Sequence, residues 1–175
     1  MGTNETVRKP TILVVDDTPD NIVLLSSLLR DTYRVKATID GEKALAILAS
    51  GEPPDIVLLD IMMPGMDGFE VCRRLKADTK TSGIPAIFLT AKSDIEDERK
   101  GLELGAVDFI TRPIKPHNVK ARLITHLQLS AAREFLRNGS VARELQAVTM
   151  PRDNSPARID PELLEALLAL ADRLR

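Results

Sequence analysis

The sequence contains no tryptophan and a single cysteine, Cys72. A lone cysteine excludes an internal disulfide framework and the paired cysteines of a structural zinc site, which fits a reducing cytoplasm. Positive charge is not in excess, because 24 Lys and Arg stand against 26 Asp and Glu, giving a formal net charge of −2. A chain with this balance is not expected to bind nucleic acid or an acidic membrane surface.

Long hydrophobic runs are also missing. No stretch of about 18 apolar residues occurs, so no membrane-spanning helix is predicted. Residues 1–10 are polar and lack the apolar centre of a signal peptide, so we expect a cytoplasmic protein. Hydrophobic residues nevertheless make up 43% of the 175 residues, which is enough to build the core of one ordinary domain and leaves roughly 45 residues over.

Short apolar runs alternate with segments of helical periodicity. The five predicted strands are 11–15, 33–38, 56–59, 84–89 and 107–110. Each is followed by a helix signal, such as Thr18-Pro19, where Thr18 is expected to be the N-cap. Five strand–helix pairs in strict order predict an α/β fold with a five-stranded, doubly wound parallel sheet and helices on both faces.

Polar residues follow several of these strands directly. Asp16 and Asp17 follow the first, Asp60 the third, Thr90 the fourth and Arg112 the fifth. Functional groups of such sheets gather at the carboxyl ends of the strands. Three acids placed so close together would repel one another, and a Mg²⁺ ion relieves that repulsion while leaving positions open for phosphate oxygens. An aspartate beside such a metal is a suitable phosphoryl acceptor, with the hydroxyl and the cation stabilising the transferred charge. An alternative interpretation is that Asp16 and Asp17 only cap the helix that follows them.

Four motifs occur in a fixed order: V-V-D-D at 14–17, L-L-D-I-M-M-P-G-M-D-G at 58–68, L-T-A-K at 89–92 and D-F-I-T-R-P at 108–113. In this combination the sequence resembles the receiver domain of bacterial two-component response regulators. The resemblance covers about residues 11–129. It implies a flavodoxin-like fold with strand order 2-1-3-4-5.

The resemblance implies roles for the acidic residues. Asp60 would be the phosphoacceptor for a histidine kinase, a phosphotransfer protein or a small phosphodonor. Asp16, Asp17 and Asp60 would hold Mg²⁺ together with the backbone carbonyl of Met62.

It also implies a switch. Thr90 would bond the phosphoryl group and Phe109 would turn inward when Thr90 moves, while Ala91 leaves room for the phosphoryl oxygens. Lys92 is a further cation close enough in sequence to reach the mouth of the site.

Arg112 departs from the family, which has lysine at this position before a proline. The charge is kept, but a planar guanidinium replaces a compact ammonium. The resemblance implies a cis bond between Arg112 and Pro113. The leading interpretation is a phosphoacceptor signalling protein, not an enzyme acting on other substrates. Two alternatives remain open: a pseudo-receiver whose switching Arg112 has ended, and a fragment of a longer regulator that lacks its output domain.

The last 45 residues extend beyond the resemblance. We predict a receiver domain at 10–130, a helical extension at 131–150, a linker at 151–159 and an amphipathic helix at 160–175. About 14 residues do not form a stable helix alone in water, so the last helix must dock on its own receiver, on a second copy or on a partner. Output is expected through this helix and the face formed by the fourth helix, fifth strand and fifth helix.

Overall fold

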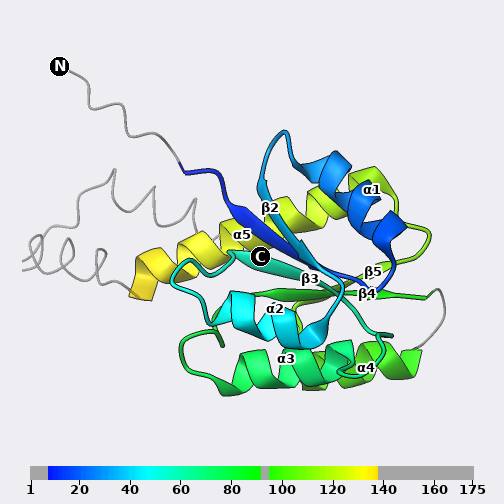
Figure 1. The fold of residues 1–175 in the computed structure, drawn as a ribbon. Helices are drawn as coiled ribbons and strands as arrows, with labels where there is room; N and C mark the ends of the chain where they lie inside the picture. The colour runs from blue at the N-terminus through cyan, green and yellow to red at the C-terminus, as the bar shows by residue number, and fades with distance from the viewer. Residues whose placement is uncertain (1–7, 92–94, 138–175) are drawn as a thin grey trace, which may run out of the picture. The chain divides into compact units, whose positions relative to one another are not determined.

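The computed structural model describes residues 8–91 and 95–137, which form five strands alternating with five helices (Figure 1). The strands are β1 (Thr11–Val15), β2 (Arg34–Thr38), β3 (Ile56–Asp60), β4 (Ala86–Thr90) and β5 (Asp108–Thr111). The helices are α1 (Pro19–Leu29), α2 (Gly41–Leu48), α3 (Gly68–Ala77), α4 (Ile95–Glu103) and α5 (Pro116–Arg137). The predicted fold class is confirmed.

Several predicted features lie outside the described residues. They are Lys92, the extension beyond residue 137, the linker at 151–159 and the helix at 160–175. The chain divides into two compact units, 1–127 and 128–175, and the described part of the second unit is the end of α5. The domain boundaries therefore stay predictions. None of the helices described is long and apolar enough to cross a membrane.

The sheet has the order β2-β1-β3-β4-β5, and all neighbouring strands are parallel. Val15 of β1 pairs with Leu59 of β3, so the residues that follow them come to lie side by side. Thr90 of β4 pairs in the same way with Thr111 of β5. Because parallel strands all end at one edge, this register brings the polar residues that follow the strands together.

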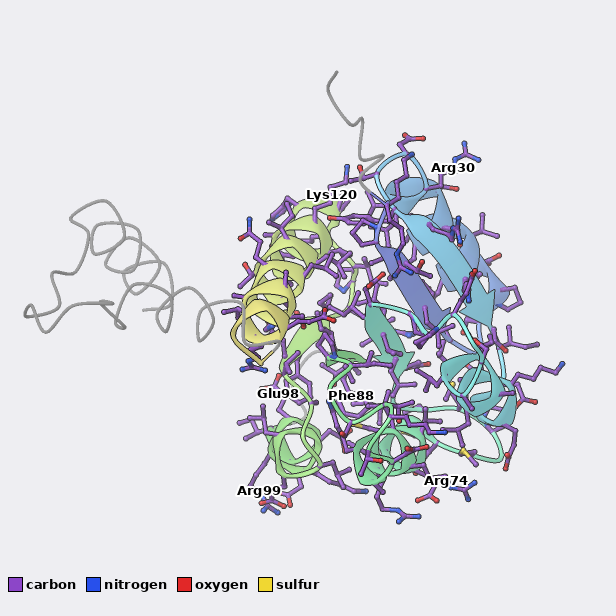
Figure 2. All side chains as sticks on the ribbon, turned by 90° about the vertical axis from the view of Figure 1, so that its left-hand side faces the viewer. Arg30, Arg74, Phe88, Glu98, Arg99 and Lys120 are labelled. Carbon is purple, nitrogen blue, oxygen red and sulfur yellow. The ribbon has the colours of Figure 1, made fainter. Side chains whose placement is uncertain are left out.

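Helices cover both faces of the sheet. Figure 1 shows α1 and α5 on one face and α2, α3 and α4 on the other. Successive residues of a strand point to opposite faces, so Leu13 and Val15 pack with α2 and α3, while Ile12 and Val14 pack with α1 and α5. Figure 2 shows Phe88 of β4 between the sheet and helices α3 and α4. Burial on both faces explains why these strands read as uninterrupted apolar runs.

Aspartate side chains cap two of the helices. Asp40 accepts hydrogen bonds from the backbone of Glu42 and Lys43 at the start of α2, and Asp67 does the same for α3. Thr18 takes the N-cap position of α1 as predicted, but its hydroxyl does not cap the helix. That hydroxyl lies 3.3 Å from a carboxylate oxygen of Asp17 instead, so α1 begins without a side-chain cap.

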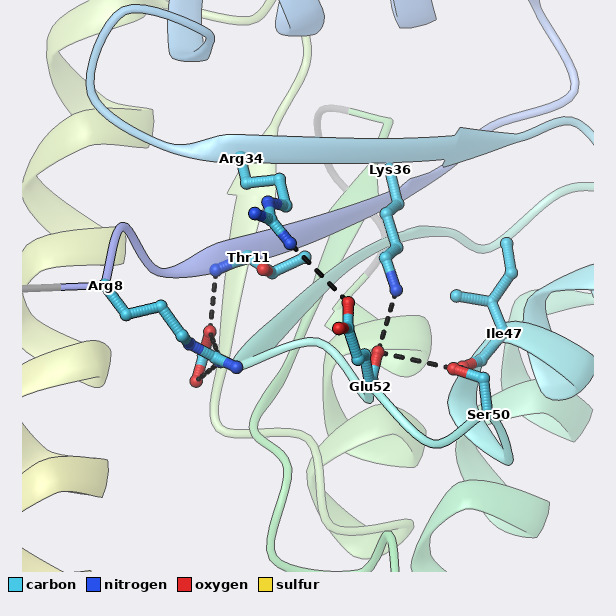
Figure 3. A network of polar contacts seen from close by, with 8 residues as sticks. Arg8, Thr11, Arg34, Lys36, Ile47, Ser50 and Glu52 are labelled. Carbon is cyan, nitrogen blue, oxygen red and sulfur yellow. Dashed lines mark hydrogen bonds and ion pairs between the residues drawn. The ribbon is translucent and has the colours of Figure 1, made fainter.

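Charged side chains secure the ends of the sheet away from the site (Figure 3). On the edge strand β2, Lys36 donates to the carbonyl of Glu52 at 2.7 Å, and Arg34 pairs with the carboxylate of the same residue at 3.5 Å. Arg8 holds both carboxylate oxygens of Asp55 at 3.0 and 2.8 Å, at the start of β3. Lysine and arginine on an edge strand also discourage pairing with another chain.

We predict that Gly68→Ala destabilises the protein by about 2–3 kcal/mol through overpacking. A Cβ at Gly68 would lie 2.0 Å from the backbone oxygen of Asp60, so β3 or α3 would have to shift. Urea unfolding measures the change. Gly83→Ala is the matched control, because nothing lies within 4 Å of a Cβ there, and equal unfolding midpoints for the two variants would contradict the close approach.

Candidate functional site

Three aspartates meet at the carboxyl edge of the sheet. Asp16 directly follows β1, Asp17 comes next, and Asp60 ends β3. Each offers one carboxylate oxygen, and these oxygens all lie within 4.8 Å of one another. Within the described ranges, this is the one cluster of three acidic, histidine or cysteine side chains with such spacing. The carboxylates that the sequence singled out are therefore brought together.

Asp16 is fully buried and is held by hydrogen bonds on both carboxylate oxygens. One oxygen accepts from the backbone N–H of Thr18 at 2.9 Å, and the side-chain amide of Asn21 reaches both oxygens at 3.0 and 3.1 Å. Arg112 donates to the other oxygen at 2.6 Å. Asn21 was not among the predicted site residues. Its position in the first turn of α1, shortly after Asp16 and Asp17 in the sequence, is the feature that could have identified it.

Arg112 links the aspartates across the site. Its Nη2 lies 2.6 Å from Asp16 Oδ2 and 3.2 Å from Asp60 Oδ1. Its backbone N–H donates to the carbonyl of Thr90 at 2.8 Å, and its peptide bond to Pro113 is cis. Three carboxylates and one guanidinium leave the site with a charge of −3 + 1 = −2 when all four groups are ionised. That charge is suited to a divalent cation.

Burial raises the pKa of Asp60 to about 6 from an ordinary value of 3.8. Arg112 opposes this increase, as does a backbone hydrogen bond from Met62, whereas the neighbouring charges of Asp16 and Asp17 add to it. The side chain of Asp60 is only 7% exposed, which is why burial dominates. An aspartate that resists ionisation beside two others is one that a cation would help to ionise.

The other predicted site residues lie at or just beyond the carboxyl ends of β3 and β4. Thr90 is buried at the end of β4, next to β3, and its hydroxyl donates to the carbonyl of Ala91 at 3.2 Å. Ala91 follows and is exposed. The side chain of Met62 is 76% exposed, so any role in the site falls to its backbone.

Phe109 belongs to a row of three aromatic rings behind the site. It stacks on Phe88 at 5.8 Å between ring centroids, and Phe88 meets Phe69 at 5.3 Å. A Cβ at Gly101 of α4 would lie 2.8 Å from Phe109, so only glycine lets α4 approach the ring this closely. The ammonium of Lys100 lies 4.0 Å from the centre of the Phe69 ring. The ring of Phe109, which is predicted to be a switch, therefore lies against α4.

The family model of the response regulator receiver domain matches residues 12–124. The chain belongs to this family. Two proteins with similar sequences are described here. A "Probable cyclic di-GMP phosphodiesterase" of Vibrio cholerae is 43% identical over 168 residues, which are 96% of this chain and 37% of that protein. "Response regulator PleD" of Caulobacter vibrioides is 50% identical over 113 residues, or 64% of this chain and 25% of that protein. The chain thus spans less than two fifths of the length of either relative.

A solved receiver domain extends the comparison to the site. The receiver of the sensor histidine kinase PA1611 from Pseudomonas aeruginosa has a TM-score of 0.63 and 29% identity. The match covers 69% of this chain and 98% of that one, and that structure has a magnesium ion coordinated in its active site cleft. The acidic cluster of the present receiver offers carboxylate oxygens, which are ligands that magnesium prefers.

We predict that metal-free receiver loses stability relative to Asp60→Asn as the pH rises from about 4 to about 6. The pKa of Asp60 is higher in the folded protein than in the unfolded chain, so the folded state holds the proton more tightly. That advantage is complete below the unfolded pKa and is lost as the pH passes the folded value near 6.

The measurement is urea unfolding of both proteins in EDTA across this pH range. The comparison with Asp60→Asn cancels the contributions of the titrating groups that do not interact with Asp60. A difference between the two proteins that stays constant from pH 4 to 7 would contradict the raised pKa.

Proposed function

We propose that this receiver accepts a phosphoryl group on Asp60 in a Mg²⁺-dependent reaction and thereby switches a protein-interaction surface. The observation that carries the proposal is the convergence of three carboxylate oxygens within 4.8 Å, with Arg112 3.2 Å from the acceptor carboxylate. The proposed donor is a histidine kinase, a phosphotransfer protein or a small acyl phosphate. Each supplies a phosphoryl group bonded to a good leaving group.

The residues present fit a magnesium ion. Asp16, Asp17 and Asp60 would hold it, joined by the backbone carbonyl of Met62. The raised pKa of Asp60 supports this assignment, because burial, and to a smaller extent the charges of Asp16 and Asp17, disfavour its ionised form. When bound, Mg²⁺ would neutralise charge on the carboxylates and on the phosphoryl oxygens.

Asp60 acts as the nucleophile in the proposed reaction. One of its carboxylate oxygens forms a bond to phosphorus, while the bond from phosphorus to the donor breaks and the donor group leaves with the electron pair. For acetyl phosphate, the leaving group is acetate. Arg112 and the hydroxyl of Thr90 then face the new negative charge, which stabilises the transferring group.

The proposed switch begins at Thr90. Its hydroxyl now donates to the carbonyl of Ala91, and a phosphoryl oxygen on Asp60 is a stronger acceptor. Movement of Thr90 would leave space behind the end of β4, into which the ring of Phe109 would turn. Because Phe109 stacks on Phe88 and lies against Gly101, a change in its position would be felt directly by α4.

The proposed output surface consists of α4, β5 and α5. Apolar side chains are exposed there, with Ile95 at 82% and Leu102 at 56% on α4 and Ile124 at 49% on α5. Asp108 at the start of β5 accepts hydrogen bonds from Arg122 and from His126 of α5. These contacts hold α5 beside β5, the strand that carries Phe109. A downstream protein or a second copy that binds here would contact both elements.

A second candidate is that the chain is the regulatory part of a longer protein. The match to the Vibrio cholerae relative named as a phosphodiesterase runs through 96% of this chain and continues past the end of the receiver family model. This supports a role for the residues after 124 in connecting the receiver to an output that the relative carries elsewhere in its length. The following experiment also tests the alternative that the chain is a pseudo-receiver, which is not phosphorylated.

We predict that the protein gains the mass of one phosphoryl group when incubated with acetyl phosphate and Mg²⁺, as measured by intact mass spectrometry. Asp60→Asn should abolish the gain, because the amide is not a nucleophile of comparable strength, and EDTA should suppress it. Asp78→Asn is the matched control, since Asp78 is exposed at the end of α3. Absence of any gain with acetyl phosphate or with a phosphorylated histidine kinase would favour the pseudo-receiver.

We predict that Asn21→Ala weakens Mg²⁺ binding by about tenfold, the loss expected when a hydrogen-bond partner of a metal-binding carboxylate is removed. The amide of Asn21 holds both oxygens of Asp16, so its removal frees that carboxylate to rotate. The Mg²⁺ dependence of the melting temperature measures the affinity. Asn118→Ala, at an exposed position of α5, should bind Mg²⁺ like the parent protein. Equal affinity in Asn21→Ala would show that Asn21 does not orient the site.

A further inference from the structure

We infer that the turn between β2 and α2, residues 38–41, positions the two segments proposed to hold Mg²⁺, with Gly41 as the positioning residue for the loop that carries the Met62 carbonyl. The inference rests on the proposed Mg²⁺ site and adds supporting residues that are not ligands. None of the four residues of this turn was among the site residues expected from the sequence, in which Asp40-Gly41 marks only the start of a helix.

The loop between β3 and α3 is closed at its base. The backbone N–H of Gly68 donates to the carbonyl of Ile61 at 2.9 Å, and a Cβ at Gly68 would lie 2.0 Å from the backbone oxygen of Asp60. The side chain of Met63 is buried in the core that α2 and α3 cover. Met62 lies between these fixed points, so the position of its carbonyl depends on what packs against the rest of the loop.

Gly41, the first residue of α2, packs against this β3–α3 loop. A Cβ at Gly41 would lie 2.9 Å from the backbone oxygen of Met66 and 2.9 Å from a methyl carbon of Val71. Val71 is fully buried and β-branched, so its side chain has no room to turn away. The backbone of Met66 or the start of α2 would therefore have to move. Figure 1 shows the two helices concerned, α2 and α3, next to each other on one face of the sheet.

The same turn supports Asp16. The backbone N–H of Asp16 donates to the carbonyl of Thr38 at 3.2 Å. The hydroxyl of Thr38 accepts from the backbone N–H of Asp40 at 3.3 Å, and the carboxylate of Asp40 caps α2. Hydrogen bonds thus connect the backbone of Asp16 to the start of α2, and Gly41 connects the start of α2 to the β3–α3 loop. A shift at Gly41 would move the Asp16 segment and the Met62 carbonyl relative to each other.

Gly41→Ala is therefore expected to weaken Mg²⁺ binding about tenfold, the lower end of the loss caused by changing groups that orient metal ligands. The substitution alters no charge and no proposed ligand, so the expected cause is the changed spacing of the two segments. A purely structural role of Gly41 would lower the stability of the protein and leave the Mg²⁺ affinity of the folded state unchanged.

The experiment titrates the full chain with Mg²⁺ and follows the backbone amide signals of Asp17 and Met62 by ¹H–¹⁵N NMR, at a temperature where each variant is folded. The resulting Kd belongs to the folded protein, and urea unfolding measures stability separately. Thr38→Val, which removes the hydroxyl that accepts from Asp40, should weaken Mg²⁺ binding in the same direction. It decides the question if Gly41→Ala does not fold.

Two glycines provide matched controls. Nothing lies within 4 Å of a Cβ at Gly51, just beyond α2, so Gly51→Ala should bind Mg²⁺ like the parent protein. Gly105 precedes β5 at the edge of the sheet opposite the site and has a φ of 94°. A side chain is strained in that conformation, so Gly105→Ala should lose stability and keep the parent Kd.

The outcomes separate this inference from the function on which it rests. A parent-like Kd in Gly41→Ala, or in Thr38→Val where Gly41→Ala does not fold, would show that the turn is only structural and would overturn the inference. Equal weakening in Gly105→Ala would overturn it as well, because a general loss of stability would then explain both results. If the parent protein itself shows no response to Mg²⁺, the proposed metal site fails and the inference fails with it.

Discussion

Repulsion among three carboxylates at one edge of a parallel sheet is the constraint on which the site depends. The register of β1 against β3 leaves Asp16 and Asp60 side by side, and the buried residues on both faces of the sheet prevent the strands from separating. Asn21, the backbone N–H of Thr18 and Arg112 donate hydrogen bonds to the carboxylate of Asp16. Burial raises the pKa of Asp60, and the charges of Asp16 and Asp17 add to that increase. The core thus holds charges together that would otherwise move apart, and a divalent cation is the simplest partner for them.

Much of the fold follows from the sequence because a parallel sheet covered on both faces needs continuous apolar strands. The predicted strands all occur, with small shifts at their ends. The fourth was predicted to begin at Ile84 but begins at Ala86. Pro85 has no N–H to donate to the ladder, so the apolar residue before it packs against the core without joining the strand. The location of the acids followed from the same logic, since strand ends are visible in sequence.

The finer features of the site were not predictable in this way. Whether a side chain such as Asn21 turns toward Asp16 depends on the rotation of α1 about its axis, which the apolar pattern fixes only approximately. Which carboxylates Arg112 reaches depends on the path of a long side chain. The motifs identified Arg112 as a departure from the family, but only coordinates reveal which of its donors are used. The role assigned to Asn21 remains a prediction that its substitution tests.

The guanidinium at position 112 has a chemical consequence beyond its shape. Acyl phosphates, the small molecules proposed as donors, also transfer acyl groups to amines, and lysine is the side chain that such modification neutralises. Arginine offers no amine of this kind and stays protonated at every physiological pH. Acetylation by acyl phosphates, which would neutralise a lysine beside Asp60, therefore does not remove the positive charge of Arg112.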